Sequence, residues 1–231
     1  MAVKPAQVIV FAPHPDDAEI GAGGTITRWV REGKDVILVI CTNGDKGTSD
    51  PKIKPEELAK TRKKETLAGA KVMGVREVIF LNQPDQGVED TPELRKEFVR
   101  LIRKYRPDAV ATTDPYRRYL SHRDHRKTGQ VVLDAVFPYA RDLYAYPDLL
   151  EAGFEPHKVT EVYLWGSEDA NYRSDITDTF GIKIEAIGCH ESQFGTPTPE
   201  RTERMRERAK ANAEGVDYEL AESFHRIQRQ R

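Results

Sequence analysis

The feature that most constrains the fold of this chain is an alternation of short apolar runs with longer amphipathic segments over its first 140 residues. The apolar runs are rich in β-branched residues and lack polar alternation, which predicts buried strands at residues 7–12, 35–41, 77–81 and 108–112. The amphipathic segments predict helices at residues 17–31, 55–73, 91–105 and 121–140. We therefore predict a Rossmann-like, three-layer α/β/α fold with a mostly parallel sheet.

The ends of several predicted helices carry the residue types that start or stop a helix. Pro55 opens one helix at its first turn, and Gly33 and Gly74 follow two of the helices as stops. Ser121 is the predicted cap of the fourth helix, which runs to about Ala140. Right-handed crossovers bring the loops that follow parallel strands to one edge of the sheet. We expect the active site at this edge, at the C-terminal ends of the strands.

The last third of the chain is less regular. It contains a predicted strand at residues 158–165 and predicted helices at 179–190 and 200–213, the last of which is highly charged. No internal repeat, low-complexity segment or linker divides the sequence. We therefore predict a single domain over residues 1–231, with a charged helical C-terminal extension from about residue 199.

The charge balance bears on the partners of the chain. Its 36 basic and 38 acidic residues leave a formal net charge of -2, so no global basic field attracts nucleic acid or an anionic membrane. We expect a small-molecule partner instead. Neither a signal peptide nor an 18-residue apolar run is present, which predicts a cytoplasmic protein. Cys41 and Cys189 lie far apart and outside any Cys-x-x-Cys pair, and we expect both to be small core residues.

The segment after the first predicted strand has the chemistry of a metal site. His14 is followed at three residues by Asp17, and an imidazole nitrogen and a carboxylate both suit Zn²⁺. Asp16 lies between them and is left free to take a proton from a metal-activated water. Taken alone, the pattern is more typical of a turn histidine followed by Asp17 as a helix N-cap.

A second cluster follows the fourth predicted strand, on the same edge of a parallel sheet. It is His122-Arg123-Asp124-His125, in which His122 and His125 share a face of a helix. Alone, such a pair is typical of an exposed helix start. Together the two clusters supply at least three zinc ligands with spare acidic and basic groups. A catalytic zinc site needs three protein ligands and an open position for water.

Two other segments suggest nucleotides or nucleic acid, and both fit poorly. The run Gly21-Ala22-Gly23-Gly24 does not match a dinucleotide fingerprint, because Ile26 stands where a small residue is needed. We expect these glycines to let the first helix pack closely on the sheet. The segment from Tyr116 to Tyr119 resembles a small nucleic-acid contact, but without a wider basic surface we interpret it as a loop at the rim of the site or a solvated turn.

The motifs resemble those of one known family. The run from His14 to Thr25, HPDDAEIGAGGT, is similar to the signature of the PIG-L/LmbE-like family of zinc-dependent N-acetylglucosaminyl deacetylases. His122 to His125 resembles the second motif of that family, usually His-Pro-Asp-His. Arg62 and Glu65 fall where the family has an Arg and a Glu. The resemblance covers roughly residues 7 to 195 and extends to Lys183 and to the segment His190-Glu191-Ser192-Gln193.

The resemblance implies a role for each matching residue. It implies that His14, Asp17 and His125 bind zinc and that Asp16 is the general base. His122 would stabilise the oxyanion in its charged form or protonate the leaving amine. The remaining roles implied are that Asp124 orients or charges His122 and that Arg62 contacts a sugar hydroxyl or the oxyanion; no role follows for His190.

The resemblance also implies a cofactor and a substrate class. One Zn²⁺ per chain is expected, although Fe²⁺ or Co²⁺ accept the same ligands. The substrate implied is a small N-acetylated sugar of the N-acetylglucosamine type, and homo-oligomers are plausible for the family. Two residues depart from the family pattern: Arg123 replaces the common proline, and Pro13 stands where alanine is usual. Both departures bear on the substrate more than on the chemistry.

Three other functions compete with this one. The chain could be a zinc amidohydrolase that acts on another N-acylated amine, or a non-catalytic sugar- or metal-binding module on the same scaffold. Asp16 and His122 argue against a pure binder, which needs neither a base nor an acid. A nucleic-acid enzyme is a remote third function, which rests on Tyr116 to Tyr119 alone.

Overall fold

The structure is a computed structural model of the chain and describes residues 4–228. The helices and strands are, in chain order, β1 (Val8–Ala12), α1 (Asp17–Arg31), β2 (Val36–Thr42), α2 (Pro55–Met73), β3 (Glu77–Gln83), α3 (Pro92–Tyr105), β4 (Ala109–Thr113), α4 (Arg123–Asp134), the π-helix η1 (Ala135–Tyr139), α5 (Pro147–Glu151), β5 (Glu161–Trp165), β6 (Tyr172–Asp175), α6 (Phe180–Gly188), α7 (Glu191–Phe194), α8 (Pro199–Asn212) and β7 (Ala221–Gln228).

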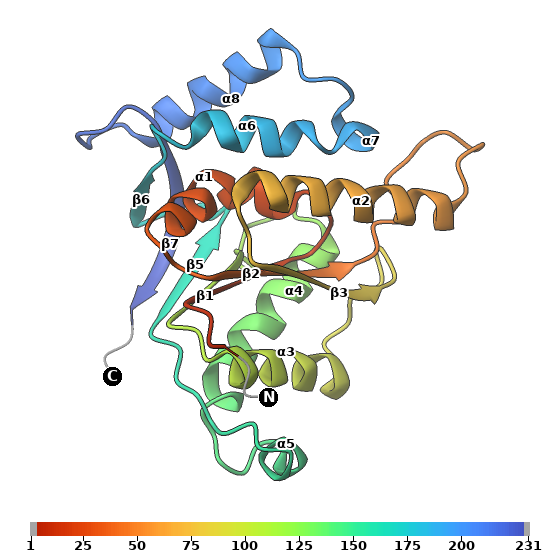
Figure 1. The fold of residues 1–231 in the computed structure, drawn as a ribbon, viewed down its shortest axis with the longest axis vertical. Helices are drawn as coiled ribbons and strands as arrows, with labels where there is room; N and C mark the ends of the chain where they lie inside the picture. The colour runs from red at the N-terminus through yellow and green to blue at the C-terminus, as the bar shows by residue number, and fades with distance from the viewer. Residues whose placement is uncertain (1–3, 229–231) are drawn as a thin grey trace.

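The strands of this part of the chain form one seven-stranded sheet in the order β3-β2-β1-β4-β5-β7-β6. The first five strands are parallel, and β7 pairs antiparallel with both β5 and β6. Helices α1, α2, α6 and α8 lie on one side of the sheet, and α3, α4 and α5 lie on the other (Figure 1). The predicted three-layer α/β/α fold with a mostly parallel sheet is confirmed.

The central strands are apolar along their whole length because helices cover both of their faces. All residues of β1 and β2 are buried. Successive side chains of a strand point to opposite faces, so Ile9 and Phe11 belong to the core beneath α3 and α4, whereas Val8 and Val10 belong to the core beneath α1 and α2. Two apolar cores therefore fix the sheet between its helical layers and hold the carboxyl ends of the strands in place.

The predicted helix ends are largely correct. Helices α1 and α2 have the predicted bounds, and α2 begins at Pro55 and is capped by Gly74 at a φ of 76°. The prediction for the fourth helix was wrong by one residue at its start, whereas the helical segment does end near Ala140, which is the C-cap of η1. His122, not Ser121, is the N-cap of α4, and the regular helix gives way at Asp134 to η1, in which Phe137 is extended and Pro138 follows.

The C-terminal part differs most from the prediction. The charged helix α8 was expected, but β6 and β7 were not, and β7 lies inside the sheet between β5 and β6. Cys189, expected in the core, is a half-buried helix C-cap, whereas Cys41 is buried in β2 as predicted. Within the described residues, none of the helices has the length and apolar character that crossing a membrane requires.

The glycines of α1 permit close packing, as predicted. A Cβ atom on Gly21 would lie 2.4 Å from the ring of Trp165 in β5, and one on Gly24 would lie 2.6 Å from Ile176. Glu222 of β7 accepts hydrogen bonds from the backbone N–H groups of Gly24 and Thr25, at 3.0 and 2.8 Å. The bare backbone of α1 is therefore held against both β5 and the C-terminal segment.

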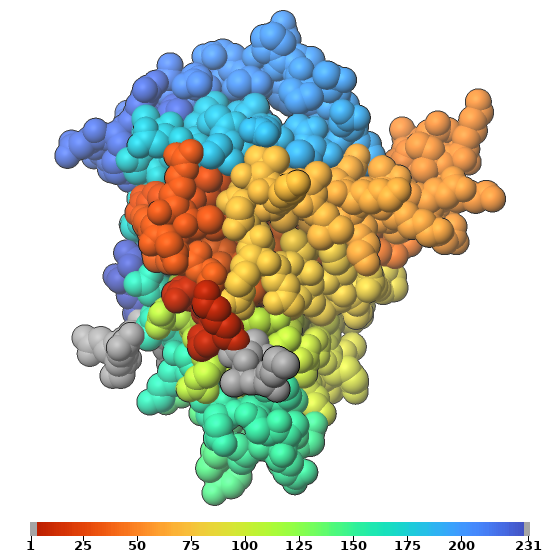
Figure 2. Space-filling view, in the orientation of Figure 1, coloured from red at the N-terminus to blue at the C-terminus, as the bar shows by residue number. Residues whose placement is uncertain are grey.

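A projecting loop follows β2. Residues 43–54, coloured orange, extend from the body of the molecule beside the start of α2 (Figure 2). The base of this loop is tied to the sheet, because the backbone N–H of Asn43 donates to the carbonyl of Gln83 at 3.0 Å.

Candidate active site

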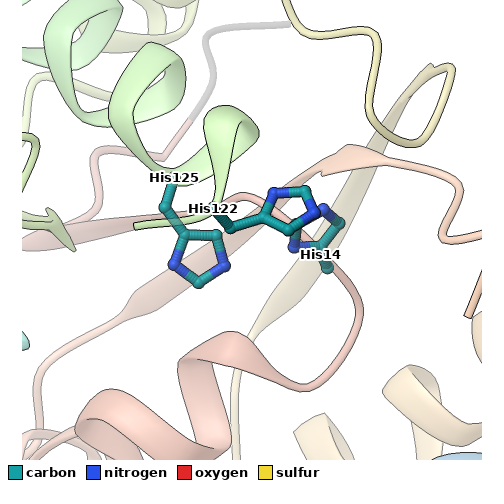
Figure 3. A group of neighbouring side chains, drawn as sticks. All are labelled: His14, His122 and His125. Carbon is teal, nitrogen blue, oxygen red and sulfur yellow. The ribbon is translucent and has the colours of Figure 1, made fainter. Parts of the chain in front are cut away.

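The two sequence clusters meet at the point where the strand order reverses. Strands β1 and β4 are neighbours in the sheet, while β2 follows β1 in sequence but pairs on its other edge. The loops that leave β1 and β4 therefore diverge and open a crevice at the carboxyl edge of the sheet. His14 lies in the loop after β1, and His122 and His125 lie at the start of α4 after β4 (Figure 3).

Asp17 lies between two of these histidines. Its Oδ2 atom is 3.1 Å from His14 Nδ1 and 3.1 Å from His125 Nε2. Two imidazoles and one carboxylate are a common ligand set of catalytic zinc. Asp17 is not the N-cap of α1, since that position belongs to Asp16. The three residues that the sequence resemblance proposes as ligands thus lie next to one another, with the Asp17 carboxylate beside both imidazoles.

His122 belongs to the same cluster. Its ring centroid lies 4.6 Å from that of His14 and 5.5 Å from that of His125. The described residues contain two groups whose ligand atoms lie close enough to hold a metal ion: His14, His122 and His125, and His14, Asp85, His122 and Asp124. His14 and His122 are common to both groups.

Carboxylates surround both ring nitrogens of His14. Nδ1 faces Asp17, while Nε2 lies 3.1 Å from Asp124 Oδ2 and 3.2 Å from Asp85 Oδ1. Burial lowers the pKa of His14, but the hydrogen bonds to Asp124, Asp17 and Asp85 outweigh burial and raise this pKa to about 11. Without a metal, His14 is therefore a doubly protonated cation at neutral pH, and a metal ion that binds to it must displace a proton.

The proposed base has an unusual conformation and environment. Asp16 has a φ of 109°, in the left-handed region, and its side chain is nearly buried. Burial and the charge of Asp17 raise the pKa of Asp16 to about 7, against the opposing charges of Arg62 and His190. A carboxyl group that titrates near neutrality is well matched to proton transfer at that pH.

Arg62 contacts Asp16 and the loops beside it. Its guanidinium donates to Asp16 Oδ2 at 3.1 Å, to the carbonyl of Pro15 at 2.6 Å and to the carbonyl of Gly44 at 2.9 Å. The side chain is only 4% exposed. Three of its hydrogen bonds are thus made within the protein, and its position fixes the orientation of the Asp16 carboxylate.

The orientation of His122 is set by its own helix. Its Nδ1 atom accepts a hydrogen bond of 3.2 Å from the backbone N–H of Asp124. Burial and the charge of His14 lower the pKa of His122, although Asp124 opposes them. A neutral ring whose Nδ1 is an acceptor carries its proton on Nε2. The role that the resemblance implies for His122, as a charged oxyanion stabiliser or as the proton donor to the amine, stays a prediction.

Asp124 is fully buried, and its carboxylate bonds to His14 and to the loop after β3 rather than to His122. It contacts Nε2 of His14 and accepts from the backbone N–H groups of Gln86 and Val88, at 2.6 and 3.1 Å. These bonds tie the loop after β3 to the start of α4. The arrangement resembles the carboxylate partner that orients a metal-binding histidine.

Sequence reasoning missed Asp85. It follows β3, is 5% exposed, and its Oδ2 atom accepts from the backbone N–H of Lys46 at 3.2 Å. Contact with His14 lowers the pKa of Asp85 to about 2 despite the opposing effect of burial. The available signal was an acidic residue directly after a parallel strand, at the edge where the site lies.

The C-terminal motif, His190 to Gln193, packs against the helices that carry the site residues. His190 Nε2 lies 3.2 Å from Glu19 Oε1, and both side chains are fully buried. Glu65 of α2 accepts hydrogen bonds of 2.7 Å from both the backbone N–H and the hydroxyl of Ser192 in α7. The motif therefore fastens α7 and the end of α6 to α1 and α2, the two helices that carry Asp17 and Arg62.

The Tyr116 to Tyr119 segment lies at the outside of the molecule. Tyr119 is 98% exposed, and Arg118 Nε lies 3.7 Å from a carboxylate oxygen of Glu168. Arg117 lines a cavity that also contains Asp17 and His125. The segment is thus part of the rim of the site.

Comparison with known proteins places this site in a family. The family of the GlcNAc-PI de-N-acetylase, PIG-L, matches residues 9–136, just over half of the chain. A diacetylchitobiose deacetylase from Thermococcus kodakarensis is 38% identical over 188 residues, which cover 81% of this chain and 70% of that protein. A probable N-acetyl-alpha-D-glucosaminyl L-malate deacetylase from Bacillus anthracis is 26% identical over 94% of this chain and 93% of its own length.

Solved structures agree with the sequence matches. The N,N'-diacetylchitobiose deacetylase from Pyrococcus horikoshii, solved with an inhibitor, superimposes with a TM-score of 0.88 at 33% identity, over 96% of this chain and 84% of that one. A 4-carboxy-2-hydroxymuconate hydratase from Pseudomonas putida shares the fold alone, at 19% identity and a TM-score of 0.78 over 99% and 98% of the two chains. The family match over residues 9–136 includes both histidine motifs, and the Thermococcus kodakarensis deacetylase is 38% identical over 81% of this chain. This chain therefore belongs to the PIG-L family.

Proposed function

We propose that this protein is a zinc-dependent hydrolase that removes the acetyl group from an N-acetylglucosamine-type amino sugar or its conjugate. The observation that carries the proposal is the convergence of His14, Asp17 and His125 beside the Asp16–Arg62 pair. The names of the similar deacetylases support the same chemistry. The substrate is thus a small molecule.

Each of the neighbouring side chains has a part in the reaction. His14, Asp17 and His125 would hold zinc, which would supply a Lewis acid for the acetyl carbonyl and for the attacking water. Asp16 takes the proton of the attacking water, and Arg62 holds its carboxylate in place. His122 donates from Nε2 to the developing oxyanion or to the amine that leaves. The amide C–N bond breaks, and the products are acetate and the free amino sugar.

The surrounding carboxylates maintain this arrangement. Asp124 and Asp85 contact Nε2 of His14, so that Nδ1, the nitrogen that faces Asp17, is the one available to the metal. Zinc suits this set of two nitrogens and one oxygen, and Fe²⁺ or Co²⁺ would also accept it.

Acetate release tests the proposal directly. Purified protein is loaded with zinc, its metal content is measured by elemental analysis, and N-acetylglucosamine and diacetylchitobiose are supplied as substrates. We expect one zinc per chain and acetate release from at least one of the two sugars. Tight zinc binding without hydrolysis of any acylated amine would instead favour a non-catalytic binding module. Hydrolysis of other N-acylated amines alone would identify a different amidohydrolase.

A further inference from the structure

A separate cavity, of about 250 Å³, lies beside α2 at the C-terminal ends of β2 and β3. Its walls come from the loop after β1, the ends of the two strands and the N-terminal half of α2. None of its lining residues belongs to the candidate metal groups, and it shares none with the cavity that contains Asp17 and His125. The volume is just below the range of drug-sized sites, so the cavity suits a small molecule.

A β-bulge shapes one wall of this cavity. β3 has one residue more than β2 between the Ile40–Phe80 pair and the Thr42–Gln83 pair. Asn82, within that interval, has a φ of 53°, a left-handed conformation that asparagine tolerates better than most residues. Bulges of this kind redirect side chains next to functional sites. Phe80 and Asn82, at the bulge, both line the cavity.

Thr42, the last residue of β2, lines the cavity and is fully buried. Its hydroxyl oxygen has no hydrogen-bond partner among the described residues. A buried hydroxyl without a partner is costly, because folding has removed it from water without providing another group to bond to. A ligand that accepts a hydrogen bond from this hydroxyl would supply the missing partner.

The mouth of the cavity carries two ammonium groups without carboxylate partners. Lys60 and Lys63 are exposed lining residues from α2, and neither forms an ion pair within the described part of the chain. Lys63 Nζ lies 5.0 Å from the centroid of the Phe80 ring. Of the lining residues only Glu56 is acidic, and it is exposed and pairs with neither lysine. Two positive charges against one negative charge favour an anion at the mouth.

Apolar side chains also line the cavity. They are Pro15, Ala59 and Phe80, and the Phe80 ring is only half-buried. The burial of the lining residues increases from the exposed lysines through Phe80 to Thr42. A molecule with an apolar body would cover the exposed part of the ring and remove it from water. From its mouth to its floor, the cavity therefore offers two cations, an apolar wall and a hydrogen-bond donor.

We propose that this cavity is a binding site for a small organic acid that carries a hydroxyl group at the end opposite its carboxylate. The carboxylate pairs with Lys60 and Lys63, the apolar body lies against Phe80, and the hydroxyl oxygen accepts a hydrogen bond from Thr42. 4-Hydroxybenzoate is a simple probe with this order of groups. Binding here does not depend on hydrolysis, because the site lies outside the metal cluster.

Calorimetry with the zinc-loaded, full-length protein tests the site. 4-Hydroxybenzoate, benzoate and phenol are titrated separately at neutral pH. We expect one saturable site for 4-hydroxybenzoate, with an affinity about threefold to tenfold above that of benzoate, which is the effect of one hydrogen bond. Phenol, which has no charge at this pH, should bind more weakly than either acid. Equal affinities of the two acids, or no saturable binding of either, would overturn the proposal.

Substitution of the lysines separates this cavity from the metal site, where a carboxylate could also bind. The double variant Lys60→Met/Lys63→Met should weaken the binding of both acids by about threefold or more. Lys64→Met is the matched control, since Lys64 is an exposed lysine of α2 that does not line the cavity, and it should leave both affinities unchanged. Unchanged binding in the double variant would place the acids elsewhere, at the metal, and would overturn the proposal.

Thr42→Val examines the hydroxyl by itself. Valine has nearly the same shape as threonine but no hydroxyl, so the ligand-free variant should unfold at the same urea concentration as the wild type or at a higher one. Its preference for 4-hydroxybenzoate over benzoate should fall to about one. Unfolding at a lower urea concentration would show that the hydroxyl already has a partner in the free protein. That result, or a preference that persists in the variant, would overturn the proposal.

Discussion

The guanidinium of Arg62 lies 3.1 Å from the carboxylate of Asp16, and both groups are nearly buried at the carboxyl edge of the sheet. The positive charge stabilises the ionised form of Asp16, while burial and Asp17 favour the protonated form. Arg62 therefore influences the base in two ways, through its position and through its charge.

The first prediction concerns the pH dependence of the reaction. A general base is active when it has lost its proton, so kcat/KM should rise with pH through the pKa of Asp16, about 7. Arg62→Met removes the charge that lowers this pKa and should move the acidic limb of the profile to higher pH. Arg62→Lys keeps the charge and should move the limb less. Lys64→Met, an exposed neighbour, serves as the control, and identical limbs in all variants would contradict the role of Arg62.

The second prediction concerns Asp16 itself. Asparagine tolerates the positive φ of this position and keeps the size of the side chain, but it cannot accept a proton from water. Asp16→Asn should keep one zinc per chain and lose about 10²- to 10⁴-fold in kcat. Elemental analysis and steady-state kinetics on the same sample measure both quantities. Full turnover with zinc bound would exclude Asp16 as the base.

The third prediction concerns metal binding. His14 is protonated at neutral pH in the absence of metal, because its pKa is raised to about 11, so zinc must displace one proton from it. The apparent affinity for zinc should therefore rise about tenfold per pH unit between about pH 7 and 8. Calorimetry in buffers with different ionisation enthalpies counts the protons released. An affinity that does not depend on pH would show that His14 is already neutral.

The fourth prediction concerns stability. Glu19 and His190 form a fully buried pair, and although burial lowers the pKa of His190, its contact with Glu19 raises it overall. A raised histidine pKa gives stability that is fully present below the unfolded-state pKa and is lost as pH rises through the folded-state pKa. His190→Gln should lower the free energy of unfolding by about 3–5 kcal/mol at pH 6, and by less at pH 9.

The double variant Glu19→Gln/His190→Gln provides the control for this pair. It removes both charges, so no uncompensated carboxylate remains buried, and its loss in urea unfolding should be smaller than the sum of the two single losses. Additive losses would show that the two side chains do not interact.

Local sequence patterns predicted the helices and strands that position the site. They did not predict β7, because its place in the sheet depends on contacts with residues far away in the sequence. The apolar runs of β1 and β2 and the Pro55 start of α2 are properties of neighbouring residues, and their predictions are confirmed. Strand β7 buries a charged residue, Glu222, among apolar ones. The Glu222 carboxylate accepts hydrogen bonds from Gly24, Thr25 and Lys183, which lie far away in the sequence. No local pattern reveals these partners.

In the site, too, local motifs predicted some residues and could not predict others. The motifs from His14 and from His122 are recognisable in the sequence, and the pairing of β1 with β4 brings them together. Asp85 has no motif around it, and its contact with His14 depends on how the loop after β3 is held by Asp124. The roles of the seven residues predicted for catalysis, substrate and metal stay predictions, which the experiments above examine.

The place of β7 in the sheet has a consequence for how the protein is made. Among the described residues β7 is the strand furthest along the chain, yet it lies between β5 and β6 and fastens the backbone of α1 through Glu222. The sheet can be completed only after residues 221–228 have left the ribosome. Nascent chains that stop before residue 221 lack β7 and should therefore remain sensitive to protease.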